Sequence, residues 1–193
     1  MKKVLFLFAA LIVSTSASAQ FEGGIKAGIN YSTIKAEKME VDGSGILGYN
    51  VGLWGRIGKA FYIQPEIYLG SKGADFKIKE NGTSIEQSGK VKFTTLDIPA
   101  LIGTKAGFKN FNLRFMAGPA FQFNLNTDES ALEQVIDPDF YKYKSFVTNI
   151  QGGLGIDFSS LSLDARYETG LQDINKEDGQ RQSLVHLSLG FKF

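Results

Sequence analysis

Residues 185–193, VHLSLGFKF, alternate apolar and polar side chains without a break. Strict alternation with a period of two is typical of a β-strand that has one apolar face and one polar face. In the rest of the chain, the face opposite the apolar one carries charged residues. The apolar face is therefore expected to meet lipid, and the chain is a candidate outer-membrane β-barrel. The apolar positions of this stretch are Val185, Leu187, Leu189, Phe191 and Phe193.

The same alternation recurs along the chain, and it predicts eight strands. Each is long enough to cross a bilayer as a tilted strand, which takes about 9–11 residues. The connections after the second, fourth and sixth strands are minimal, whereas the others are longer and more polar. This pattern predicts an all-β fold, an eight-stranded antiparallel up-and-down transmembrane β-barrel with short periplasmic turns and long extracellular loops. The expected strands are Glu22–Thr33, Leu47–Gly58, Phe61–Phe76, Val91–Gly107, Phe111–Leu125, Ser145–Phe158, Leu161–Ile174 and Gln182–Phe193.

The N-terminus has the pattern of a secretory signal peptide. Lys2 and Lys3 precede an apolar run, Val4 to Val13, which is too short to span a bilayer as a helix. Small residues at 17–19 provide a cleavage site. We therefore expect residues 1–19 to be a cleaved signal peptide and residues 20–193 to be the barrel domain, exported to the bacterial outer membrane.

Composition excludes several classes of function. The formal net charge is +1 and no strongly basic patch stands out, so nothing indicates a nucleic-acid partner. The chain has no cysteine, which rules out disulfides and thiolate metal sites. We predict no cofactor and no metal site.

The polar faces of the predicted strands carry charges of both signs. An eight-stranded barrel leaves an interior just wide enough for side chains, so these charges are expected to pair and fill it. Asp164, Arg166 and Glu168 form one inward row of the seventh strand, and Arg114 is expected to join them. We thus predict a plugged interior, not an open channel. The candidate interior network comprises Glu66, Asp97, Arg114, Asp164, Arg166 and Glu168.

The longest connection, residues 126–144, is the candidate partner-binding loop. Thr127 is expected to cap a short helix that ends at Pro138. Three aromatic residues follow, Phe140, Tyr141 and Tyr143. Exposed aromatic side chains in loops often bind partners. A folded lid over the barrel mouth remains the alternative.

Residues of special chemistry have simple structural explanations. His186 is the only histidine, and strand alternation turns it inward, away from any membrane-facing catalytic surface. No catalytic site is therefore predicted, and the protein is not expected to be an enzyme. Pro65 and Pro99 are expected to mark bulges or bends. The glycines of 152–155 are expected to make room for a large interior side chain such as Trp54 or Arg114.

Several short segments together resemble the PorT-like outer-membrane β-barrel family of Bacteroidetes, whose architecture is similar to that of the small OmpA and OmpX barrels. The resemblance covers nearly the whole mature chain. It implies an outer-membrane barrel and suggests a link to protein secretion, but it implies no catalytic residue. The segments are Gly24–Asn30, Gly52-Leu53, Ile63–Tyr68, Ser71–Gly73, Leu96–Pro99, Ala117–Pro119 and Leu163–Tyr167.

The leading hypothesis is a non-enzymatic outer-membrane protein with a structural or interaction role through its surface loops. The alternatives are a component of a secretion or envelope-assembly machine, a small solute channel, a lipid-modifying enzyme, and a soluble lipocalin-like barrel with an apolar interior. The expected partners are outer-membrane lipid, the barrel-assembly machinery during biogenesis, and an envelope protein. The aromatic residue Phe193 resembles the signal by which that machinery recognises its clients.

Overall fold

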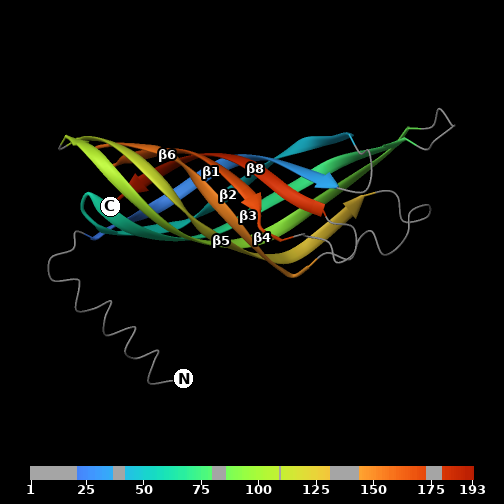
Figure 1. Cartoon of the computed structure of the whole chain (residues 1–193), viewed down its shortest axis with the longest axis horizontal. Helices are drawn as coiled ribbons and strands as arrows, with labels where there is room; N and C mark the ends of the chain where they lie inside the picture. Colours follow the sequence, from blue (N-terminus) through green and yellow to red (C-terminus); the bar gives the residue numbers. More distant parts are fainter. Residues whose placement is uncertain (1–20, 37–41, 80–85, 109, 131–143, 173–179) are drawn as a thin grey trace, which may run out of the picture.

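A computed structural model describes residues 21–36, 42–79, 86–108, 110–130, 144–172 and 180–193. Eight strands follow one another around a closed barrel, and each is antiparallel to its neighbours. The last strand pairs with the first and closes the sheet, as Figure 1 shows. The predicted fold class is confirmed. The strands are β1 (Phe21–Ala36), β2 (Asp42–Gly58), β3 (Phe61–Lys79), β4 (Glu86–Phe108), β5 (Phe111–Ser130), β6 (Phe146–Phe158), β7 (Leu161–Gly170) and β8 (Gln180–Lys192).

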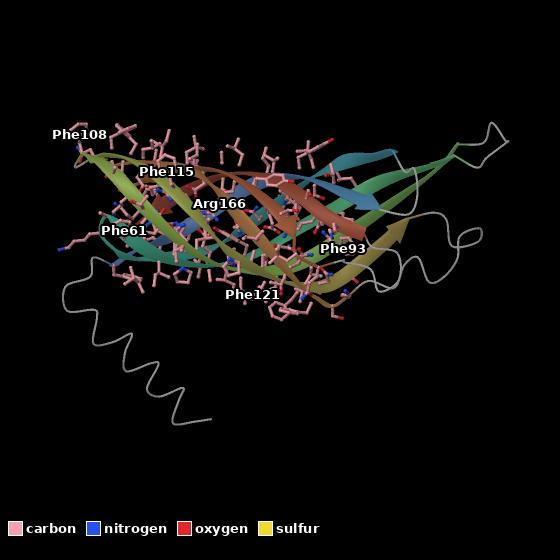
Figure 2. The ribbon with its side chains drawn as sticks, viewed as in Figure 1. Phe61, Phe93, Phe108, Phe115, Phe121 and Arg166 are labelled. Atoms are coloured by element: carbon pink, nitrogen blue, oxygen red, sulfur yellow. The ribbon has the colours of Figure 1, made fainter. Side chains whose placement is uncertain are left out.

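The barrel is apolar outside and polar inside. The outward positions of β1, for example, are Ile25, Ile29 and Tyr31, each about half exposed, while Lys26 and Asn30 between them are buried. Figure 2 shows outward phenylalanines such as Phe61 and Phe115 along the wall. A soluble lipocalin-like barrel would place its apolar rows inside, so that alternative is wrong. Within the described residues, no helix is long and apolar enough to cross a membrane.

The strands differ in length, so the wall is uneven. β3 and β4 have 19 and 23 residues, whereas β6 and β7 have 13 and 10. All the short turns lie at the end of the barrel that also holds the C-terminus, and β3 and β4 extend furthest at the opposite end (Figure 1). We call these ends the turn side and the loop side. In outer-membrane barrels the turn side faces the periplasm.

The predicted helix cap at Thr127 is wrong. Thr127 is not a helix cap, because β5 continues to Ser130 and pairs Thr127 with Phe93 of β4. A β-branched residue beside an already formed strand continues the sheet readily. The rest of the predicted helix, and the aromatic residues Phe140, Tyr141 and Tyr143, lie outside the described residues.

The prolines do not mark bulges. The register between β3 and β4 does not shift from the pair Pro65–Ala100 to the pair Tyr68–Asp97. The register between β4 and β5 is likewise unchanged from Pro99–Ala120 to Ile102–Ala117. Proline lacks only its own N–H, so the strand on either side keeps its pairing. Within the described strands, the register shifts lie elsewhere, between Gly45 and Asn50 and between Thr94 and Thr95.

Candidate functional site

The centre of the barrel holds two cations and two carboxylates in direct contact, a cluster we call the central group. Lys26 Nζ of β1 lies 2.9 Å from Glu66 Oε1 of β3 and 2.6 Å from Asp164 Oδ2 of β7. Arg166 of β7 donates to both oxygens of Glu66, at 2.5 and 2.7 Å, and to Asp164 at 2.6 Å. Figure 2 shows Arg166 in the middle of the barrel. The group thus connects strands that are not neighbours in the sheet.

Neutral donors complete the coordination of Glu66. Gln64 Nε2 and Tyr68 Oη each donate to this carboxylate at 2.6 Å. Glu66 is 3% exposed, so its charge needs hydrogen-bond partners within the barrel. Alternate residues of β3 point to the same face, which is why Gln64, Glu66 and Tyr68 meet inside.

Nearer the periplasmic turns, a second cluster of charges forms the turn-side group. Arg56 Nη1 lies 2.8 Å from both Glu22 Oε2 and Asp157 Oδ2. Lys105 Nζ lies 3.1 Å from Glu22 Oε1. Arg114 connects this group to the centre, because its Nε is 2.9 Å from Asp157 and its Nη2 is 2.5 Å from Asp164.

Glycine provides the space for Arg114. A Cβ added to Gly155 would lie 2.6 Å from Arg114 Nη2, well inside contact distance. The prediction that the 152–155 segment makes room for Arg114 is therefore confirmed at Gly155. Trp54 instead lies over Gly24, whose added Cβ would be 2.9 Å from Trp54 Nε1.

Trp54 is packed against the cations. Its ring centroid is 4.9 Å from Arg56 Cζ and 5.7 Å from Lys26 Nζ. Its indole N–H donates to the carbonyl oxygen of Ile25 at 3.2 Å. The only tryptophan of the chain therefore lies inside the barrel, 4% exposed, beside two groups of charges. A cation near the face of an aromatic ring is attracted to it electrostatically.

Towards the loop side, a third cluster surrounds Lys72 and forms the loop-side group. Lys72 Nζ lies 2.9 Å from Asp97 Oδ1 and 3.2 Å from Glu168 Oε1. Asn149 donates to Glu168 at 2.7 Å, and His186 Nε2 lies 3.2 Å from Glu168 Oε2. Strand alternation turns all of these side chains inward, so the one histidine belongs to this network.

Open space is unevenly distributed along the interior. A polar cavity of about 340 Å³ lies at the turn side, lined by Glu22, Lys105 and Asp157 among others, whereas little space remains between the central and loop-side groups. The cavity lined by Asn50, Arg166, Glu168, His186 and Ser188 among others has a volume of about 20 Å³. That is room for about one water molecule. Glu168, His186 and Ser188 do line it together, but no substrate larger than water fits beside them. Among the described residues, no cluster of histidine and carboxylate side chains is arranged to hold a metal ion.

The structure brings the six network residues chosen from the sequence into the interior, distributed over the three groups. Glu66, Asp164 and Arg166 are in the central group, Asp97 and Glu168 in the loop-side group, and Arg114 connects the centre to the turn side. The six-residue choice omitted two cations that link these carboxylates, Lys26 and Lys72. It also omitted Arg56, which pairs with Glu22 and Asp157 in the turn-side group. Strand alternation turns all three side chains inward as well.

An apolar outer surface around a closed, eight-stranded, charge-filled interior defines a small outer-membrane-type barrel. The profile of the family described as "Outer membrane protein beta-barrel domain" matches residues 14–176. The chain belongs to this family, and the family places it in the outer membrane.

Solved structures show the same fold at low sequence identity. Ail of Yersinia pestis, solved in complex with the heparin analogue sucrose octasulfate, has a TM-score of 0.50 and 16% identity, over 90% of this chain and 99% of Ail. OprG of Pseudomonas aeruginosa has a TM-score of 0.50 and 12% identity, over 91% of this chain and 95% of OprG. The outer membrane enzyme PagL matches with a TM-score of 0.43 and 11% identity, over 84% of this chain and 97% of PagL. No curated protein matches the chain by sequence.

Proposed function

We propose that this protein is a non-enzymatic outer-membrane barrel whose interior is a structural plug and whose extracellular segments contact a partner. The observation that carries the proposal is the filled centre of the barrel. Lys26, Arg114 and Arg166 each contact two carboxylates, and the cavity beside Arg166 has room for about one water molecule. The outward surface is apolar and suits lipid. This leaves the loop side as the surface for interaction.

The interior argues against catalysis and against conduction. A nucleophilic site needs a reachable histidine, and His186 is 8% exposed and in contact with Glu168. Because fold alone does not define function, this argument rests on the site. For solute conduction, we expect single barrels in planar bilayers to show no steady open-channel current. A stable current from the unmodified protein would instead support the small-channel alternative.

Two further parts of the proposal, the bacterial group with its alternative function and the signal peptide, are supported by the sequence alone. The resemblance to the PorT-like family supports an origin in Bacteroidetes and, as the alternative function, a role in a secretion or envelope-assembly machine. The N-terminal pattern supports a cleaved signal peptide at residues 1–19. N-terminal sequencing of the protein from outer membranes tests the cleavage, with residue 20 as the expected first residue.

Single cysteines offer a direct test of the interaction role, because the natural chain contains none. Cysteines placed within residues 126–144 are cross-linked in intact cells and the products identified by mass spectrometry. We expect a reproducible protein partner and labelling by a membrane-impermeant reagent. A cysteine at Ser160, in a periplasmic turn, is the matched control and should do neither. Labelled loop cysteines that capture nothing in repeated experiments would contradict the interaction role.

A further inference from the structure

The outer wall of the barrel contains an open apolar groove of about 990 Å³ across β2 to β6. It arises where short side chains come between large ones. The paired row Ile63, Ile102, Ala117, Gly152 runs across four strands, and its last two members are small. A Cβ added to Gly152 would meet its nearest atoms at 3.5 Å, an ordinary van der Waals distance, so a methyl group fits there without displacing a neighbour. Most of this wall is otherwise covered by large apolar side chains.

The groove reaches the turn side. Phe61, Thr104 and Phe115 form the adjacent paired row, and Phe61 is the first residue of β3. Gly58 and Phe61, which both line the groove, flank the two-residue turn that contains the exposed Lys59. The Lys59 backbone N–H donates to the Phe61 carbonyl oxygen at 3.1 Å, which fixes the turn beside the groove. A cation thus stands at the membrane interface where an apolar groove begins.

We propose that this groove is a binding site for one phospholipid of the periplasmic leaflet, with an acyl chain over Ala117 and Gly152 and the phosphate near Lys59. The leaflet follows from the position of the groove, since the short turns of outer-membrane barrels face the periplasm. A basic residue at the interface attracts anionic headgroups. Because the groove is apolar and open to the bilayer, an acyl chain can pack along it. The proposal goes beyond the loop-mediated role and does not depend on it.

The test measures binding of dioleoyl phosphatidylglycerol to the intact barrel in mild detergent by native mass spectrometry. Ala117→Leu fills the groove, and we expect binding of the first lipid to weaken about tenfold. Ala165→Leu is the matched control, because Ala165 also faces lipid but lies outside the groove, between Leu154 and Leu187. It should bind like the natural protein. Unchanged Trp54 fluorescence establishes that each variant is folded.

Two further variants separate the contribution of the acyl chain to lipid binding from that of the headgroup. Gly152→Ala has room for its added methyl group and should weaken binding by a smaller factor, so the proposal remains testable if Ala117→Leu does not fold. Lys59→Gln should remove the preference for phosphatidylglycerol over phosphatidylcholine and leave the apolar contribution. Equal binding by Ala117→Leu, Gly152→Ala and the natural protein would overturn the site. Equal loss in Ala165→Leu would show unspecific annular lipid, and a change only in oligomeric state would assign the groove to a second copy.

Discussion

Replacing Arg166 by methionine removes the charge that holds the central group together. Arg166 is 5% exposed and contacts Glu66 and Asp164 at 2.5 to 2.7 Å. At an effective dielectric constant near 20, unit charges at about 4 Å attract by about 4 kcal/mol. Removing one partner of a buried pair costs about 3–5 kcal/mol, because the other charge stays buried without compensation. Lys26 and Arg114 still contact these carboxylates, so we expect a loss near the lower end, about 3 kcal/mol.

The measurement is urea unfolding in detergent micelles, followed by the fluorescence of Trp54. This tryptophan lies beside Lys26 and Arg56 and reports on the interior directly. Lys192→Met is the matched control. Its Nζ is 3.7 Å from Glu22 Oε1 and its side chain is 33% exposed, so the change should cost at most about 1 kcal/mol.

A double-mutant cycle measures the interaction energy between Arg166 and Glu66. In the Arg166→Met background, Glu66→Gln removes the carboxylate that has lost one of its two cations. The double variant should therefore be less destabilised than the sum of the single variants, by about 1–3 kcal/mol. The explanation fails if Arg166→Met costs no more than Lys192→Met, or if the two substitutions simply add.

Other substitutions test the interior space and the lipid-facing surface by the same unfolding measurement. Gly155→Ala places a methyl group against the buried Arg114 and should cost about 1–3 kcal/mol. Gly152→Ala faces the membrane and its methyl group meets neighbours only at van der Waals distance, so it should change stability by no more than about 0.5 kcal/mol. Equal effects of the two substitutions would refute the space assigned to each glycine. Leu187→Arg puts a charge on the outward face near the middle of β8 and should cost about 2–4 kcal/mol of stability in lipid bilayers. The control Leu187→Phe should be nearly neutral. A tolerated arginine would mean that this face does not meet hydrocarbon.

Strand alternation made the wall of the barrel predictable from sequence. Each residue of a strand points to the face opposite its neighbour, so the apolar and charged rows could be assigned before any pairing was known. The short turns at residues 59–60 and 159–160 then set the order and direction of the strands. The ends of strands were less certain, because polar residues near the loop side fit a strand or a loop equally well. This ambiguity produced the wrong helix prediction at Thr127.

The contacts of the interior could not be predicted. Alternation says that Lys26 and Asp164 face inward, but not that they touch across the lumen from β1 and β7. That contact depends on how β1 and β7 each pair with β8, where Lys26 lies opposite Gly190 and Asp164 opposite Ser188, and these two registers have no clear sequence signal. Proline positions gave a false indication, since Pro65 and Pro99 lie where the register is continuous.

The interior contacts also select one strand register, which the outer surface cannot do. A strand that slips by two residues keeps its apolar side chains in lipid, so the bilayer discriminates weakly between such registers. The same slip moves Glu66 away from Lys26 and Arg166 and leaves buried charges unpaired, at a cost of several kcal/mol. Because an unpaired buried charge is costly, the ion pairs of Glu66 and Asp164 with Lys26 and Arg166 favour one register of β1, β3 and β7. We infer that the plug fixes how the barrel closes, and that closing the lumen to solutes is a consequence of the same contacts.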